Sequence, residues 1–261
     1  MEVFPEERKR YILDQLEQSP KVRVTEISRK FSVSTETVRR DLGELEGEGL
    51  LKRVYGGAIK TNDQSEPPLL SRQQVKATEK EKIAKSAAAL IKDDSTILLD
   101  VGTTVLQLAK EIKDKRNITI LTNSFLAAGA LMENIDKDYF SGTVILLGGQ
   151  LDPRQYSMTG KVAEMVLEQF TVDQAFISVG GISLENGLSD FDFDECMISK
   201  KMIEAAKEVV VLADGSKLGT NTFCKFGALE DVDIVVSEVA MPASWQGNEK
   251  FRTVEWMTTR D

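Results

Sequence analysis

The chain has 261 residues, with 33 lysines and arginines against 42 aspartates and glutamates and no histidine, so its formal net charge is -9. This length suits one large or two unequal domains, and the lack of histidine excludes histidine metal sites, Ser-His-Asp and Cys-His triads, and imidazole proton shuttles. Two cysteines and no apolar run of about 18 residues predict a cytoplasmic protein with no disulfide framework, membrane partner, metal or cofactor.

The charge is divided unevenly along the chain. Residues 1–60 hold 12 basic and 11 acidic side chains, whereas the other 201 residues hold 21 and 31 and carry a net charge of -10. Between these parts, residues 61–68 are polar and end in Pro67 and Pro68, which disfavour a preceding helix. We therefore predict an N-terminal domain over residues 1–60, a linker over 61–77 and a second domain over 78–261.

Three short helices are predicted in the N-terminal domain. Pro5 suits the first turn of a helix that ends near Ser19. A second helix has apolar residues at i, i+3 and i+7 from Val24, and a third, with Ser34 as its N-cap, has them at i, i+4 and i+7 from Val38. Two such helices joined by a short turn are typical of a helix-turn-helix.

The exposed side of the third helix carries groups that bind DNA in other proteins. Glu36 and Arg40 lie opposite its apolar stripe, with Thr37 and Arg39 on the flanks. Arginine can bond guanine edges or neutralise phosphate, and threonine can reach either target. This helix is therefore the candidate element for binding in the major groove of double-stranded DNA.

A short basic hairpin, or wing, is predicted over residues 51–58. Gly56-Gly57 would form its turn, and Lys52 and Arg53 would lie beside that turn, where a phosphate contact is as reasonable as a solvated surface.

Simpler explanations of the same residues stay open at this stage. Glu36 and Arg40 could form an i,i+4 salt bridge, and Glu44, Glu46 and Glu48 make the end of the third helix a poor partner for phosphate. The three helices could also form a module that contacts only protein.

Residues 34–58 closely resemble the signature of the DeoR family of bacterial transcriptional regulators. The core of the resemblance is Thr37-Val-Arg-Arg-Asp-Leu42 followed by Gly56-Gly57-Ala58. It implies a winged helix-turn-helix with Thr37, Arg39 and Arg40 near DNA. The full set of candidate DNA-binding residues is Ser34, Thr35, Glu36, Thr37, Arg39, Arg40, Lys52, Arg53, Tyr55 and Gly56.

Two positions depart from the family's usual pattern. Tyr55 stands where the family commonly has histidine, and Gly43 stands where a polar residue is common. Glycine in mid-helix costs about 0.5–1 kcal/mol relative to alanine, and the sequence offers no reason for it at position 43.

From Thr78 onward, helices alternate with apolar strands. The strands are predicted at residues 96–99, 118–121, 143–147, 175–179, 209–212 and 232–236. Continuous apolar strands separated by helices favour a parallel sheet covered on both faces. The predicted fold is thus a winged helix-turn-helix followed by a larger α/β domain with a mostly parallel sheet.

Small polar residues follow five of these strands. Ligands of open α/β sheets bind outside the carboxyl ends of the strands. Gly102-Thr103-Thr104 would open a helix and aim free N–H groups and a positive dipole end at an anion, while Lys217 adds a mobile charge. The candidate effector-binding residues are Asp100, Gly102, Thr103, Thr104, Asn123, Ser124, Gly148, Gly149, Gly180, Gly181, Glu195, Asp214 and Lys217.

This set suits a small phosphorylated sugar or polyol better than a nucleotide, because neither GxxxxGK[ST] nor GxGxxG is present. Asp100, Glu195 and Asp214 could accept hydrogen bonds from sugar hydroxyls. The alternative is that the glycines and hydroxyls form only turns and N-caps.

The resemblance extends over this second domain. Asp100-Val-Gly-Thr-Thr104, Leu121-Thr-Asn-Ser124, Leu147-Gly-Gly149, Gly187-Leu-Ser-Asp190 with Asp194-Glu195, and Leu212-Ala-Asp-Gly-Ser-Lys-Leu-Gly219 look like the DeoR effector domain. That domain is similar to sugar-phosphate isomerases of the ribose-5-phosphate isomerase and glucosamine-6-phosphate deaminase type. The resemblance implies that residues 102–104 hold phosphate and that Asn123, Glu195 and Lys217 line the sugar pocket.

Two functions are consistent with these features. In the first, which we favour, the chain is a repressor of a carbohydrate operon, acts as a dimer or tetramer, and is released by a phosphorylated sugar. In the second, the C-terminal domain still isomerises its ligand, with Glu195 or Asp100 as base and Lys217 stabilising the enediolate.

Overall fold

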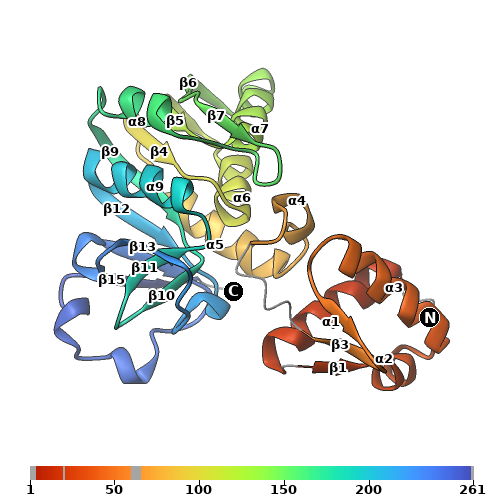
Figure 1. Ribbon diagram of the computed structural model, residues 1–261. Coiled ribbons are helices and arrows are strands. Elements are labelled where there is room, and N and C mark those ends of the chain that lie inside the picture. Colours follow the sequence, from red (N-terminus) through yellow and green to blue (C-terminus); the bar gives the residue numbers. More distant parts are fainter. Residues whose placement is uncertain (1–3, 20, 60–65, 260–261) are drawn as a thin grey trace. The chain divides into compact units, whose positions relative to one another are not determined.

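The computed structural model describes residues 4–19, 21–59 and 66–259, and the chain splits into two compact units, Met1–Ala77 and Thr78–Asp261 (Figure 1). Of the linker predicted over residues 61–77, the segment 61–65 lies outside the described residues. The short helix α4 (Leu69–Arg72) lies within the remainder.

The first unit is a winged helix. Three helices and three short strands follow one another as α1 (Pro5–Gln18), β1 (Lys21–Arg23), α2 (Val24–Phe31), α3 (Thr35–Gly47), β2 (Lys52–Val54) and β3 (Gly57–Ile59). The strands form an antiparallel sheet in the order β1-β3-β2. The three predicted helices and the wing are therefore present, and β1 is an addition that periodicity did not reveal.

Local residues explain where the helices of this unit begin and end. Ser32 adopts the left-handed conformation, with φ 52°, and ends α2. Ser34 caps α3 as predicted, because its hydroxyl accepts a hydrogen bond from the Thr37 N–H at 3.1 Å. The predicted apolar stripe of α3 is buried against α1 and α2, with Val38 and Leu42 almost without exposed surface.

The turn of the wing lies one residue earlier than predicted. Tyr55 and Gly56 form it, and Gly56 has a φ of 76°, which favours glycine. Gly57 instead begins β3, where a side-chain Cβ would lie 1.9 Å from the carbonyl oxygen of Val22. Gly57 is thus needed for the close approach of β1 and β3 rather than for the turn.

The second unit is built on a seven-stranded parallel sheet with the order β15-β14-β12-β9-β4-β5-β6. Its strands are β4 (Thr96–Leu99), β5 (Lys115–Thr122), β6 (Phe140–Leu146), β9 (Val172–Ser178), β12 (Ala206–Leu212), β14 (Ile234–Ser237) and β15 (Glu255–Thr258). All six predicted strands are present, and β15 adds an edge strand.

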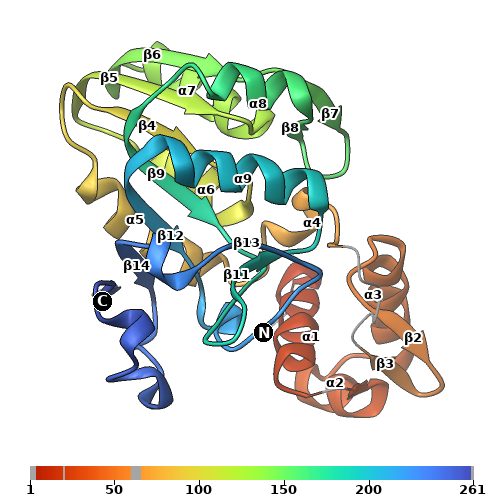
Figure 2. The ribbon, with the colours of Figure 1, turned by 60° about the vertical axis from the view of Figure 1, so that its left-hand side comes forward.

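Helices cover both faces of this sheet (Figure 2). On one face, α5 (Ala77–Leu90), α6 (Thr103–Glu111) and α7 (Phe125–Asp136) enclose one hydrophobic core. On the other face, α8 (Lys161–Leu167) and α9 (Phe193–Ala205) enclose a second. No helix in the described ranges is long and apolar enough to cross a membrane.

Short elements complete the second unit near α8 and α9. Three of them form a small antiparallel sheet, β10 (Gly181–Ser183), β11 (Gly187–Asp190) and β13 (Cys224–Gly227). Two more, β7 (Gln150–Asp152) and β8 (Ser157–Thr159), form a hairpin. Single turns of 3-10 helix lie at Gly215–Lys217, Leu229–Asp231, Ala243–Trp245 and Glu249–Phe251.

The strand order places most of the candidate effector residues together, at the carboxyl ends of neighbouring strands. The five strands that precede them, β12, β9, β4, β5 and β6, are neighbours in the sheet and run parallel, so their carboxyl ends lie side by side. After β4 the chain adds β5 and then β6 on one side of β4, and it later returns to place β9 on the other side of β4, so the direction of strand addition reverses at β4. A reversal of this kind creates the crevice in which open α/β sheets bind ligands.

Candidate functional site

A groove lies between the start of α3 and the wing. It has a volume of about 610 Å³ and includes six of the candidate DNA-binding residues together with two others, and we call it the α3–wing groove. Its lining residues are Ser34, Glu36, Thr37, Arg39, Arg40, Gly43, Glu44 and Arg53. The structure thus brings the first turns of α3 and one basic residue of the wing into one surface.

The cations of this groove differ in their surroundings. Arg39 pairs with Glu36 at 3.2 Å, one turn earlier in α3, and both side chains are largely exposed. Arg40 is exposed and makes no ion pair with the described part of the chain, so the expected pair with Glu36 is formed by Arg39 instead. Both arginines are accessible from solvent. The ion pair of Arg39 would not prevent it from binding a ligand, because exposed ion pairs are weak.

The wing arginine is held more firmly. The Arg53 N–H donates to Glu46 Oε1 at 2.7 Å, and its guanidinium lies 3.8 Å from the same carboxylate. At the tip of the wing, Tyr55 and Gly56 are exposed, Tyr55 completely so. Lys52 is exposed on β2, and Thr35 is exposed in the first turn of α3.

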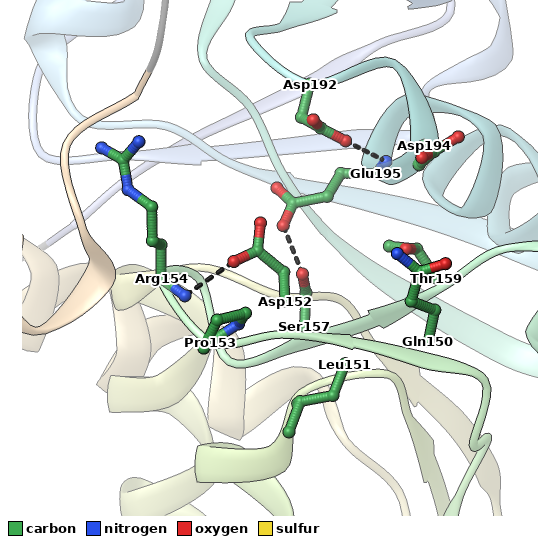
Figure 3. A pocket seen from close by; sticks show the side chains of 10 residues that line it. All are labelled: Gln150, Leu151, Asp152, Pro153, Arg154, Ser157, Thr159, Asp192, Asp194 and Glu195. Carbon is green, nitrogen blue, oxygen red and sulfur yellow. Dashed lines mark hydrogen bonds between the residues drawn. The ribbon is translucent and has the colours of Figure 1, made fainter.

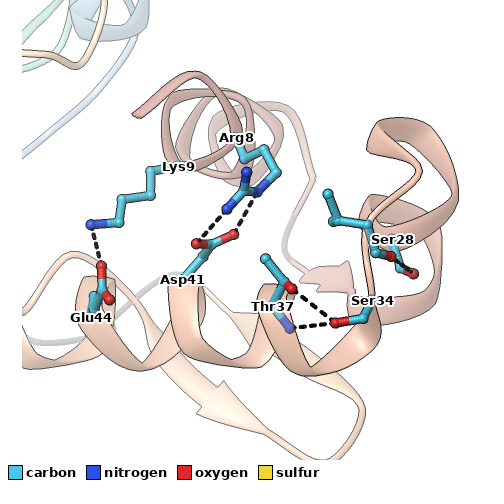
Figure 4. Close-up of polar contacts among 8 residues, drawn as sticks. Arg8, Lys9, Ser28, Ser34, Thr37, Asp41 and Glu44 are labelled. Carbon is cyan, nitrogen blue, oxygen red and sulfur yellow. Dashed lines mark hydrogen bonds and ion pairs between the residues drawn. The ribbon is translucent and has the colours of Figure 1, made fainter. Parts of the chain in front are cut away.

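Two ion pairs fix α3 against α1 (Figure 4). Arg8 donates to both oxygens of Asp41, at 2.9 and 3.0 Å, and both side chains are at least 96% buried. The hydrogen bond to Asp41 is the main cause that raises the pKa of Arg8. Lys9 pairs with Glu44 at 2.5 Å, so one of the glutamates expected to repel phosphate is already neutralised.

At the carboxyl ends of the sheet, β4 and β9 approach closely. Gly102 has a φ of 148°, and a Cβ at this position would lie 2.3 Å from Ser178 Oγ at the end of β9. Only glycine allows this approach, which places the amino end of α6 at the reversal of the strand order. Gly102 supplies no side-chain cap to α6, whose first residues, Thr103 and Thr104, are buried.

Asp100 directly follows β4 at this reversal of the strand order and is fully buried. Its carboxylate accepts hydrogen bonds from the Val101 N–H at 2.8 Å, the Ser199 hydroxyl at 2.9 Å and the Ser178 N–H at 3.3 Å. Burial nevertheless raises the pKa of Asp100 to about 7, although these hydrogen bonds act in the opposite direction. Asp100 therefore titrates near neutral pH.

Asn123 follows the neighbouring strand, and it is adjacent to Asp100 because Leu99 and Thr122 are partners in the sheet. The side chain has no exposed surface, its Oδ1 accepts no hydrogen bond from the described residues, and its amide lies close enough to Asp100 to help lower the pKa of that carboxyl. Buried amides are rarely left unsatisfied, so this side chain marks a position for a polar ligand or water. Ser124 caps α7 by accepting from the Ala127 N–H, as the turn-and-cap alternative predicts.

Asp214 and Lys217 lie after β12. Burial alone would raise the pKa of Asp214, but the positive charge of Lys217 and hydrogen bonds from Ser216 outweigh it, so this pKa is lowered. Asp214 is therefore an anion at neutral pH, and its oxygen already accepts from the Ser216 N–H at 2.9 Å. This aspartate organises the loop that carries Lys217.

Glu195 lies in the first turn of α9 and contacts the β7–β8 hairpin. Its carboxylate accepts from the Ser157 hydroxyl at 2.5 Å, and its N–H donates to Asp192, the N-cap of α9. A pocket of about 300 Å³ opens beside it, lined by Gln150, Leu151, Asp152, Pro153, Arg154, Ser157, Thr159, Asp192, Asp194 and Glu195 (Figure 3). We call this the acidic pocket, because four carboxylates line it.

Three of the four remaining candidate glycines serve close packing, and the fourth, Gly148, serves a left-handed turn. A Cβ at Gly149 would lie 2.4 Å from the carbonyl oxygen of Thr159, and one at Gly181 would lie 2.3 Å from that of Thr220. Gly180 faces Asp190, and Gly148 has a φ of 73° with open space around it. These four positions shape the loops around the crevice.

Three serines that the sequence analysis did not single out form hydrogen bonds with the candidate carboxylates Asp100 and Glu195. Ser178 and Ser199 bond Asp100, and Ser157 bonds Glu195. Ser199 also lies one turn after Glu195 on α9 and donates to its carbonyl oxygen, so α9 links the two carboxylates. No short motif marks these serines, because their partners are distant in the sequence.

Comparison with known proteins identifies the lineage. Residues 8–64 match the DeoR-like helix-turn-helix domain, and residues 75–239 match the DeoR C terminal sensor domain. The chain belongs to the DeoR family. As a DeoR-family protein it is a DNA-binding transcriptional regulator, which confirms the function expected from the resemblance.

Individual relatives span nearly the whole chain. The glycerol-3-phosphate regulon repressor of Escherichia coli (strain K12) is 32% identical over 233 residues, covering 89% of this chain and 90% of the relative. The HTH-type transcriptional repressor GlcR of Bacillus subtilis (strain 168) is 35% identical over 237 residues, covering 90% and 89%.

Among solved structures, ribose 5 phosphate isomerase A from Neisseria gonorrhoeae is similar to part of the DeoR-family chain. The TM-score is 0.40 at 14% identity, covering 54% of this chain and 53% of the isomerase.

Proposed function

We propose that this DeoR-family regulator represses a carbohydrate operon and that a phosphorylated sugar or polyol bound at the carboxyl ends of the sheet controls its affinity for the operator. The observation that carries the effector site is Asn123, a fully buried amide whose Oδ1 has no hydrogen-bond donor among the described residues, near the start of α6, which has no side-chain cap. A relative named as a glycerol-3-phosphate regulon repressor and another named as the transcriptional repressor GlcR support the regulatory role.

The charges of the crevice suggest an orientation for the ligand. A phosphate would bind at the amino end of α6, where free N–H groups and the helix dipole favour an anion, with Lys217 as an additional positive charge. It would avoid the acidic pocket, whose carboxylates repel it. The hydroxyl groups of the sugar would then face Glu195, which lines this pocket, rather than Asp100, which is buried and already accepts three hydrogen bonds.

On the DNA side, Thr37, Arg39 and Arg40 would enter the major groove, while Arg53 and Tyr55 of the wing would contact the backbone beside it. One such unit makes few contacts, so we propose a symmetric dimer or tetramer that reads two half-sites about 34 Å apart or multiples of that distance. Such a protein would act in the cytoplasm, where the operator is.

We further propose that the second unit binds its ligand without converting it. Of the two carboxylates that could act as bases, Asp100 is fully buried and accepts three hydrogen bonds, and Glu195 is held by the Ser157 hydroxyl. Purified protein incubated with pentose and hexose phosphates should leave them unchanged by NMR. Turnover well above that of buffer would favour the isomerase alternative.

The effector proposal is tested by a thermal-shift panel of sugar and polyol phosphates, each beside its unphosphorylated counterpart. A phosphorylated compound should raise the melting temperature, and the same compound should change binding to a duplex selected by the protein from random DNA. Equal stabilisation by the unphosphorylated counterpart would contradict the assignment of phosphate to residues 102–104. An Asn123→Ala variant should lose the shift, whereas Lys137→Ala, on the exposed end of α7, should keep it.

A further inference from the structure

We propose that Gly43 and Glu46 of α3 form a seat that holds the wing arginine, Arg53, in position for a DNA phosphate. The inference rests on the proposed role of the wing in DNA binding. It also gives a reason for the glycine in the middle of the recognition helix, for which the sequence offered none.

The first part of the seat is the carboxylate of Glu46. It accepts the backbone N–H of Arg53 at 2.7 Å and lies 3.8 Å from the guanidinium of the same residue. The Glu46 side chain thus fixes the middle of β2 to α3 and attracts the guanidinium of Arg53 toward the helix. The guanidinium remains about half exposed, so it is available to a ligand.

The second part is the missing side chain of Gly43. A Cβ at this position would lie 3.1 Å from an Nη of Arg53, which is closer than an ordinary van der Waals contact. The guanidinium therefore occupies the space that a side chain would fill. Both residues line the α3–wing groove with Thr37, Arg39 and Arg40, so the seat places a third cation beside the two of α3.

The two effects of Gly43 on the protein have opposite signs. Glycine weakens the helix, because its backbone loses more conformational freedom than that of any other residue. It also leaves room for Arg53. Filling position 43 should therefore strengthen α3 while it pushes the guanidinium outward, and a larger side chain should push it farther.

The test uses the full-length chain and a mixed-sequence duplex of about 40 base pairs, with affinity measured between about 50 and 200 mM salt. Arg53→Ala should weaken binding about tenfold, which corresponds to the low end for a charge-assisted hydrogen bond. It should also reduce the salt slope by about 0.9, as expected for one phosphate contact. Gly43→Ala should weaken binding about twofold by a small displacement, and Gly43→Leu about as much as Arg53→Ala.

Gly47 supplies the matched control, since it is the last residue of the same helix and a Cβ there meets nothing within 4 Å. Gly47→Leu should leave DNA affinity unchanged. Both Gly43 variants should melt at a temperature no lower than that of the parent, so their weaker binding would not reflect unfolding. In an Arg53→Ala background, Gly43→Leu should cause no further loss.

The outcomes separate this inference from the function on which it rests. If Arg53→Ala binds DNA as tightly as the parent, the wing contact itself is wrong. If Arg53→Ala binds more weakly but Gly43→Leu matches the parent, the contact stands and the seat is wrong. The seat is also wrong if Gly43→Leu weakens binding equally in the presence and absence of Arg53, because the leucine would then act on the DNA directly.

Discussion

Asp41→Asn tests the contribution of the buried ion pair to the DNA-binding unit. Arg8 and Asp41 are at least 96% buried, and they form two hydrogen bonds of 2.9 and 3.0 Å. Removing one partner of such a pair leaves a buried charge and costs about 3–5 kcal/mol. That is a large share of the roughly 5–15 kcal/mol that stabilises a typical domain.

The two units can be followed separately in this experiment. Both tryptophans, Trp245 and Trp256, lie in the second unit, so their fluorescence reports the sensor domain alone. Amide hydrogen exchange of peptides from α3 reports the winged helix. Asp41→Asn should reduce protection in α3 by at least a hundredfold, the factor that about 3 kcal/mol implies, and should leave the tryptophan transition unchanged.

A double variant provides the control. Arg8→Met combined with Asp41→Leu should recover most of the lost stability, because apolar residues of similar volume can replace a buried pair at little cost. A loss of protection of less than tenfold in Asp41→Asn would refute the reasoning, since the pair would then be worth no more than an exposed one.

Three further outcomes are expected. Gly102→Ala should destabilise the sensor domain and abolish the effector-induced thermal shift, because its Cβ would lie 2.3 Å from Ser178 Oγ; an unchanged shift would contradict this. Burial raises the pKa of Asp100 from 3.8 to about 7, so the folded chain binds this proton more tightly than the unfolded chain. The unfolding free energy should therefore rise by roughly 2–3 kcal/mol as pH falls from 8 to 5, and Asp100→Asn should flatten that dependence in chemical denaturation. Cys224 should react with a thiol reagent before Cys196, which is buried and whose pKa is raised by burial and by Cys224; mass spectrometry of labelled peptides would show the order.

Local patterns were sufficient for most of the fold. Apolar spacing and the Ser34 cap placed three helices of the winged unit, and apolar runs placed six strands of the sheet. The helices bury a periodic apolar stripe and the strands are continuous apolar runs, so both kinds of element are visible in the sequence. Strand β1 has only Val22 buried, and the antiparallel strands β10, β11 and β13 have three or four residues each, too few for a period to be visible.

The candidate site was predictable in composition but not in geometry. The polar residues after parallel strands had to meet at one edge, because the carboxyl ends of such strands lie together. The partners of Asp100 could not be inferred, since Ser199 lies 99 positions away and depends on how α9 packs. The same holds for Gly43, whose neighbour Arg53 is placed by the antiparallel wing.

The strand order also affects the course of synthesis. Every strand of the winged unit finds its partner by Ile59, whereas β4 in the centre of the large sheet pairs with β5 by Thr122 and gains its second neighbour only when Ala175 of β9 has been made. At the usual 5–20 residues per second, the remaining 200 or so residues take roughly 10–40 s to emerge after the winged unit. The winged unit can thus fold on the ribosome well before synthesis of the sensor domain is complete.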